Sequence, residues 1–309
     1  MSLLLKKEGI FTSIQGSGHF GLQSFGFNPR GAMDRTAARI ANILAGNNDD
    51  ANVLEMHFPA AEIEFDAGCR FALAGADFTA SLDGQYLANW CLHFAKPGQV
   101  LRFEKKSVGN RAYLAVEGGF EPDCGTAFST IRKEKGDLLR TRTSASTLSA
   151  TDRCVSVSKN VLPAYSSFPS VRILPGGEFG SLSEVDRQSL LTEAFTISNE
   201  SNRMGFRLKG PTLAVRQRAE MVSAAVTFGT IQLPPDGQLI VLMADHQTSG
   251  GYPRIANVIS ADLPILAQLG PGEKVSFMPV EIFEAEQAAA QREADLAWLR
   301  TGVRFGRYW

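Results

Sequence analysis

The chain has 309 residues, a formal net charge of −1, and 20% charged and 44% hydrophobic residues. This is the composition of a globular protein, long enough for two domains that each have their own core. Charges of both signs in nearly equal number exclude a protein that binds nucleic acid or an anionic membrane through its net charge.

Cys69, Cys91, Cys124 and Cys154 form no Cys-x-x-Cys pair, and no histidine stands near them at metal-ligand spacing. We therefore expect free, mostly buried thiols and no metal site. The first residues, MSLLLKKEGIF, place leucines before lysines, the reverse of a secretory signal, and no apolar run is long enough to cross a bilayer. The expected location is the cytoplasm.

A first helix is predicted to begin after Asp34 and to end at Gly46. Aspartate is a preferred N-cap residue and glycine a common residue after the last helical turn. The apolar residues between them share one face; they are Ala37, Ala38, Ala41 and Leu44. Asp34 has two possible roles, the helix cap and a base that faces a cleft, and the sequence leaves both open.

Residues 54–116 change to short alternating segments separated by turns such as Asp83-Gly84. This pattern predicts strands at 62–65, 70–73, 79–82, 100–103 and 112–116, which together form a closed or nearly closed β-structure. Asp77 comes at the end of one strand, where it either forms a turn or faces a cleft.

Residues 141–169 are rich in serine and threonine and are the best candidate for a linker. We therefore divide the chain into a first domain, residues 1–165, and a second domain, residues 166–309. In the second domain we expect strands at 171–174, 230–233, 238–243 and 274–277, and helices at 183–194, after Asp262, and at 281–300. The last of these is the strongest helix pattern in the chain.

Residues 244–259, ADHQTSGGYPRIANVI, follow an apolar run that is long enough for one buried strand. The strand would deliver polar groups to its own end, and Gly250-Gly251 would allow positive φ and an anion-binding turn of N–H groups. An ordinary strand-to-loop turn is the alternative. Arg203, in a second polar turn, would hold a ligand carboxylate or phosphate.

Several segments resemble one family. They are Gly31-Ala-Met-Asp34, Leu73-Ala-Gly-Ala-Asp77, Ala112-Tyr-Leu-Ala-Val-Glu-Gly-Gly119, Ser201-Asn-Arg-Met-Gly205, the run from Gly229 to Gln238, and residues 244–259. The chain resembles the carboxyltransferase-type family over most of residues 9–278. That family includes the C-type subunit of bacterial ATP-dependent 5-oxoprolinase, allophanate hydrolase subunit 2, the antagonist of the Kip sporulation-kinase inhibitor, and a domain of urea carboxylase.

The resemblance implies a mainly β protein with a few helices, built as two cyclophilin-like β-barrel domains. It also implies a heteromer with a B-type subunit, and with an A-type subunit, that opens 5-oxoproline to glutamate at the expense of ATP, together with Mg. Family members usually carry an aspartate and an arginine where this chain has Gly16 and His19, and a basic residue at the position of His246. The two histidines restore positive charge only when they are protonated.

The site hypothesis combines the resemblance with the polar turns. Opening a lactam with ATP requires anion-binding amides, cationic side chains and a base. The catalytic candidates are Asp34, Asp77 and Asp245. The candidates for binding substrate or nucleotide are Asn202, Arg203, Gln232, Gln247, Thr248, Gly250, Gly251, Tyr252 and Arg254, and no metal ligand is expected.

Two other functions remain open. The chain would transfer a carboxyl group from carboxybiotin to urea or a similar amide, in which case another protein must carry the biotin. Alternatively, it would be a regulatory module of the Kip antagonist type that binds a partner protein without turnover.

Overall fold

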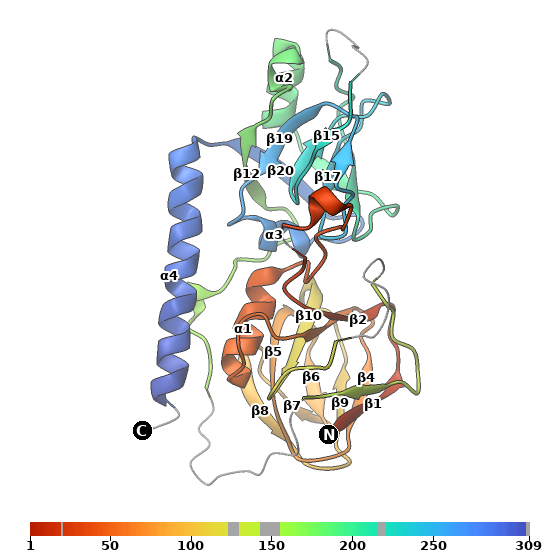
Figure 1. Ribbon diagram of the computed structural model, residues 1–309, viewed down its shortest axis with the longest axis vertical. Helices are drawn as coiled ribbons and strands as arrows, with labels where there is room; N and C mark the ends of the chain where they lie inside the picture. The colour runs from red at the N-terminus through yellow and green to blue at the C-terminus, as the bar shows by residue number, and fades with distance from the viewer. Residues whose placement is uncertain (20, 123–129, 143–154, 216–220, 307–309) are drawn as a thin grey trace. The chain divides into compact units, whose positions relative to one another are not determined.

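Two compact units make up the chain in a computed structural model that describes residues 1–19, 21–122, 130–142, 155–215 and 221–306 (Figure 1). The first unit contains Met1–Gly18, Asp34–Pro163 and Glu293–Trp309, and the second contains His19–Met33 and Ala164–Arg292. The predicted division between residues 165 and 166 differs from these units at residues 164–165 and in the two longer segments 19–33 and 293–309. Cys124, Cys154 and the middle of the expected linker lie outside the described residues.

The described residues of the first unit form eleven strands. Their bounds are β1 (Ser2–Lys7), β2 (Thr12–Gln15), β3 (Val53–His57), β4 (Glu62–Phe65), β5 (Cys69–Asp77), β6 (Ala80–Leu82), β7 (Gln85–Tyr86), β8 (Cys91–Ala95), β9 (Val100–Phe103), β10 (Val108–Val116) and β11 (Leu138–Arg140). They form a sheet of order β11-β1-β4-β9-β6-β7 and a sheet of order β2-β3-β10-β5-β8. Alternate residues such as Ile63 and Phe65 of β4 are buried in one apolar core, because successive side chains of a strand point to opposite faces.

Helix α1 (Arg35–Ala45) packs on β5 and β10 of the first unit. Asp34 caps it by accepting a 2.8 Å hydrogen bond from the amide of Ala37, and Gly46 ends it with a φ of 78°. Both predicted helix boundaries are confirmed.

The second unit is a closed barrel of order β12-β19-β16-β17-β14-β13-β20. Its strands are β12 (Ser170–Pro175), β13 (Phe195–Ile197), β14 (Gly205–Lys209), β16 (Thr230–Gln232), β17 (Ile240–Leu242), β19 (Arg254–Val258) and β20 (Lys274–Pro279). A separate two-stranded ribbon pairs β15 (Ala224–Ala225) with β18 (Ser249–Gly250). The barrel encloses a second apolar core, so the mainly β fold class predicted from the sequence is confirmed.

Three further helices were placed correctly by their sequence patterns: α2 (Glu184–Thr192), α3 (Leu263–Ala267) and α4 (Ile282–Gly306). Ser183 caps α2 by accepting a hydrogen bond from the amide of Asp186. Short 3-10 turns, η1 (Gln23–Phe25), η2 (Lys159–Val161) and η3 (Phe179–Ser181), complete the described elements. None of the helices among the described residues is long and apolar enough to cross a membrane.

Candidate functional site

A buried ion pair lies where β17 ends. Arg203 Nε donates to Asp245 Oδ2 and its Nη2 donates to Asp245 Oδ1, both at 2.9 Å. Nη2 also donates to the carbonyl of Gly31 at 2.6 Å, and the arginine is only 7% exposed. A bidentate pair fixes the plane of the guanidinium relative to the plane of the carboxylate, so this contact sets the position of the turn after β17.

Hydrogen bonds to main-chain carbonyls stabilise the same turn. The amide of Arg30 donates to the carbonyl of Ala244 at 2.9 Å, and Asn28 Nδ2 donates to the carbonyl of Asp245 at 3.2 Å. The segment 19–33 is therefore part of the second unit and holds the predicted site turn in place.

Gly250 and Gly251 do not adopt the positive φ that the sequence predicts for them. Gly250 belongs instead to β18 and pairs with Ala224. The expectation of positive φ at these glycines is therefore wrong. Glycine is needed at 250 for another reason: an added Cβ would lie 2.5 Å from Nε2 of Gln232.

Gln232 is buried beneath that glycine. It ends β16 with 1% of its surface exposed, and its Nε2 makes no hydrogen bond to any described residue. Gln232 faces Arg254 in the register of β16 and β19, so the two side chains emerge on the same face of the barrel.

Arg254 forms a salt bridge with Glu178, a residue that was not among the candidates predicted from the sequence. Its Nε and Nη2 donate to the two carboxylate oxygens at 3.1 and 3.0 Å, and its amide donates to Oε2 at 2.8 Å. The hydrogen bonds from Arg254 lower the pKa of Glu178, and the same contact raises the pKa of Arg254. Glu178 follows the turn Pro175-Gly-Gly, and a carboxylate directly after such a turn was the signal that could have found it.

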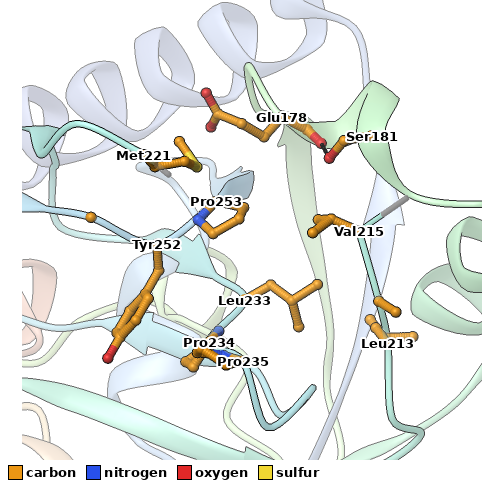
Figure 2. Close-up of a pocket in the computed structure, with 12 residues that line it drawn as sticks. Glu178, Ser181, Leu213, Val215, Met221, Leu233, Pro234, Pro235, Tyr252 and Pro253 are labelled. Atoms are coloured by element: carbon orange, nitrogen blue, oxygen red, sulfur yellow. Dashed lines mark hydrogen bonds between the residues drawn. The ribbon is translucent and has the colours of Figure 1, made fainter. Parts of the chain in front are cut away.

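A pocket of about 470 Å³ opens at one end of the barrel, where β12 and β16 end and β19 begins (Figure 2). These ends coincide because β19 runs antiparallel to both other strands. Met221, Pro253 and Leu233 face the space, with Glu178 and Ser181 on one side of it. The remaining lining residues are Leu213, Ala214, Val215, Pro234, Pro235, Gly251 and Tyr252. The walls are thus mainly apolar, as in most small-molecule sites.

The other polar candidates of the second unit have local roles. Asn202 Oδ1 accepts from the amide of Met204 at 2.8 Å and shapes the turn before β14. The carbonyl of Thr248 accepts from the amide of Val226 at 3.3 Å, and the carbonyl of Gln247 accepts from the ring of His246 at 2.5 Å. His246 is fully buried, whereas His19 is exposed.

Asp34 and Asp77 lie in the first unit and make structural contacts. The amide of Asp34 donates to the hydroxyl of Tyr113 at 2.8 Å, and that hydroxyl donates to buried Glu55 at 2.8 Å. Burial raises the pKa of Tyr113 well above its ordinary value, which keeps the hydroxyl protonated. Asp77 accepts from the amide of Thr79 at 2.8 Å, the geometry of a turn.

The structure thus brings the second-unit candidates into two groups. Arg203 and Asp245 form the ion pair after β17. The second group surrounds the ribbon and the pocket and contains Gln232, Gly250, Gly251, Tyr252 and Arg254.

A family comparison agrees with this architecture. The sequence model of the family described as "Carboxyltransferase domain, subdomain A and B" matches residues 25–279. The chain belongs to the carboxyltransferase-domain family. It is 34% identical to the C-type subunit of 5-oxoprolinase from Haemophilus influenzae, over 93% of this chain and 94% of that protein.

Longer proteins are also similar to the chain over part of their length. The chain is 26% identical to urea amidolyase of Saccharomyces cerevisiae, over 88% of this chain and 16% of that protein. The crystal structure of Kluyveromyces lactis urea carboxylase shares the fold, with a TM-score of 0.88 at 24% identity, over 98% of this chain and 29% of that one.

The described residues around the pocket of this carboxyltransferase-family chain do not fit the phosphates of ATP. The described walls are mainly apolar, and the charges of Glu178, which lines the pocket, and of Arg254 neutralise each other. Among the described residues, no group of three or more His, Cys, Asp or Glu side chains is placed to hold a metal ion such as Mg²⁺.

Proposed function

We propose that the protein is the C-type subunit of an ATP-dependent 5-oxoprolinase, an enzyme of several subunits that opens the lactam ring of 5-oxoproline to give glutamate. The observation that carries this proposal is the 34% identity to a C-type 5-oxoprolinase subunit across 93% of this chain and 94% of the relative. A correspondence over nearly the whole of both proteins favours the same role in the same assembly.

The proposed role of this chain is to bind and orient substrate. ATP and its Mg²⁺ would be held mainly by other subunits, since the described pocket offers a triphosphate no unneutralised cation. Arg203 and Asp245 would then position the turn that carries Gln247 and Thr248, and the side chains of that turn would contact substrate. Asp34 and Asp77 would act as a helix cap and a turn former, not as bases.

The partners in this proposal are a B-type subunit, which forms a heteromer with this chain, and an A-type subunit, in the cytoplasm. Their existence is supported by the name of the relative, which describes that protein as one subunit of an enzyme. A cleft completed by a second chain would supply cationic groups beyond those of the described pocket residues.

A second candidate is carboxyl transfer to urea. It is favoured by the 26% identity to urea amidolyase over 88% of this chain. The chain corresponds to only 16% of that protein, so under this candidate the biotin and its carboxylating domain would lie outside the 309 residues of this sequence. A regulatory module of the Kip antagonist type would assemble with a partner but form no product.

Reconstitution tests the proposal. The chain is co-expressed with an A-type and a B-type 5-oxoprolinase subunit, and glutamate formation from 5-oxoproline and ATP is measured with each protein omitted in turn. The proposal predicts glutamate only when this chain is present. Glutamate formation at an undiminished rate without it would refute the proposal.

A further inference from the structure

The ribbon formed by β15 and β18 covers a side-chain donor that no described residue satisfies. Gly250 of the ribbon lies directly against the amide of Gln232, which is 1% exposed. Nε2 of this glutamine has no hydrogen-bond partner within the described part of the chain. Hiding an N–H group from water without a partner is unfavourable, so the covered arrangement carries a penalty.

Within the described part of the chain, few hydrogen bonds hold the ribbon in place, and one of them joins Gln23 Nε2 to the carbonyl of Val226 at 3.4 Å. Each of its strands has two residues. The amide of Val226 donates to the carbonyl of Thr248 at 3.3 Å, and Nη1 of Arg254 donates to the carbonyl of Ala225 at 3.4 Å. Both distances are longer than the common 2.9–3.0 Å for N–H···O bonds, which makes these bonds weak. A short ribbon with weak bonds above an unsatisfied donor opens at low cost.

An apolar pocket and a hydrogen-bond donor lie beneath and beside the ribbon, and together they can bind a ligand. Gly251 follows β18 directly and lines the apolar pocket, while Met221 lines it from the segment that leads into β15. Arg254 emerges beside Gln232 on the same face of the barrel and remains bound to Glu178. Opening the ribbon would therefore join the Gln232 amide to the pocket.

We propose that the β15–β18 ribbon is a strap that opens to let Gln232 Nε2 donate a hydrogen bond to a carbonyl or carboxylate oxygen of a small molecule. The apolar part of that molecule lies in the pocket against Leu233 and Pro253. Only the identity of the molecule, a lactam, rests on the proposed function. The glycine at 250 permits the closed state, because a side chain there would collide with the glutamine amide.

Hydrogen exchange at the amide of Val226, measured by NMR on the full chain, tests the strap. Gln232→Leu removes the unsatisfied donor and keeps most of the volume, so the closed state gains stability. We expect exchange about fivefold slower than in the wild type. Gly250→Ala forces a methyl group into the glutamine amide, and we expect faster exchange. The matched control is Gln188→Leu at an exposed position of α2, which should leave Val226 unchanged.

The ligand part of the proposal has its own measurement. Excess pyrrolidinone, a neutral lactam, should speed exchange at Val226 in the wild type, because a ligand that binds only the open strap raises its population. It should have no effect in Gln232→Leu. If Val226 exchanges at the same rate in Gln232→Leu as in the wild type, the proposal that the ribbon opens as a strap is refuted. If pyrrolidinone does not accelerate exchange in the wild type, the proposal that Gln232 binds a ligand is refuted. Neither result depends on 5-oxoprolinase turnover, so failure here is separate from failure of the proposed function.

Discussion

Arg203 and Asp245 are joined by two hydrogen bonds of 2.9 Å, although 42 residues separate them in the sequence. The side chains are 8% and 16% exposed, so water screens their attraction little. The main chain repeats the link, since the amide of Asp245 donates to the carbonyl of Arg203 at 2.8 Å. Two polar turns predicted separately from the sequence are therefore one structural unit.

Arg203→Ala should destabilise the second unit by about 3 kcal/mol, because it leaves the Asp245 carboxylate buried without its cation. Urea unfolding followed by circular dichroism measures the loss. The matched control is Arg207→Ala on β14, whose side chain is 55% exposed and which should change the free energy of unfolding by less than about 0.5 kcal/mol. Equal effects of the two substitutions would refute a structural role for the ion pair.

Gln247→Ala should leave the stability unchanged and lower kcat/KM of the assembled enzyme by about tenfold or more. The side chain is half-buried, and it makes no hydrogen bond to any residue that the structure describes, so its removal breaks no internal contact. Steady-state kinetics with 5-oxoproline and a thermal melt provide the two measurements. Gln287→Ala, at an exposed position of α4, is the control for a loss of glutamine. Full activity in Gln247→Ala would remove this residue from the site.

The Glu178–Arg254 pair should make stability depend on acid pH. Hydrogen bonds from Arg254 lower the pKa of Glu178 below its ordinary value of 4.5. A lowered folded-state pKa means that the stabilisation is complete above the unfolded-state pKa and is lost as the pH falls through the folded-state pKa. Unfolding free energies of the wild type and Glu178→Gln should therefore differ most at about pH 7 and converge as the pH falls through the folded-state pKa of Glu178. A difference that stays constant over that range would contradict this assignment.

Tyr113→Phe should destabilise the first unit by about 2 kcal/mol, because the hydroxyl serves both the Asp34 amide and the Glu55 carboxylate in a buried site. Calorimetry of the full chain gives the change in melting temperature. Tyr86→Phe on β7, where the side chain is 67% exposed, is the control and should have little effect. A melting temperature equal to that of the wild type would show that the hydroxyl does not support the α1 cap.

Most of the fold could be predicted from local patterns in the sequence. The cap at Asp34, the stop at Gly46 and the alternation that buries Ile63 and Phe65 depend on residues close in sequence, and each was predicted correctly. Segment 19–33 joins the second unit through contacts such as Arg203 with Gly31, which span 172 residues. No local pattern encodes a contact at that separation.

The candidate site was predicted as a set of residue types and not as an arrangement. The glycines at 250 and 251 predicted a turn with positive φ, but the pairing of Gly250 with Ala224 places it in an extended ribbon. Arg254 was predicted to bind ligand, and Glu178, 76 residues earlier in the chain, engages its guanidinium. Sequence patterns identify charged groups, whereas the pairing of those groups follows from the barrel topology.

The most direct test of the central claim is the stoichiometry of turnover in the purified complex of this chain with its A-type and B-type partners. Glutamate and inorganic phosphate are quantified with ATP and either 5-oxoproline or urea as substrate. We predict equal amounts of glutamate and phosphate with 5-oxoproline, and no phosphate release above background with urea. Phosphate release that depends on urea and a biotin carrier, without glutamate from 5-oxoproline, would contradict the 5-oxoprolinase assignment and support carboxyl transfer.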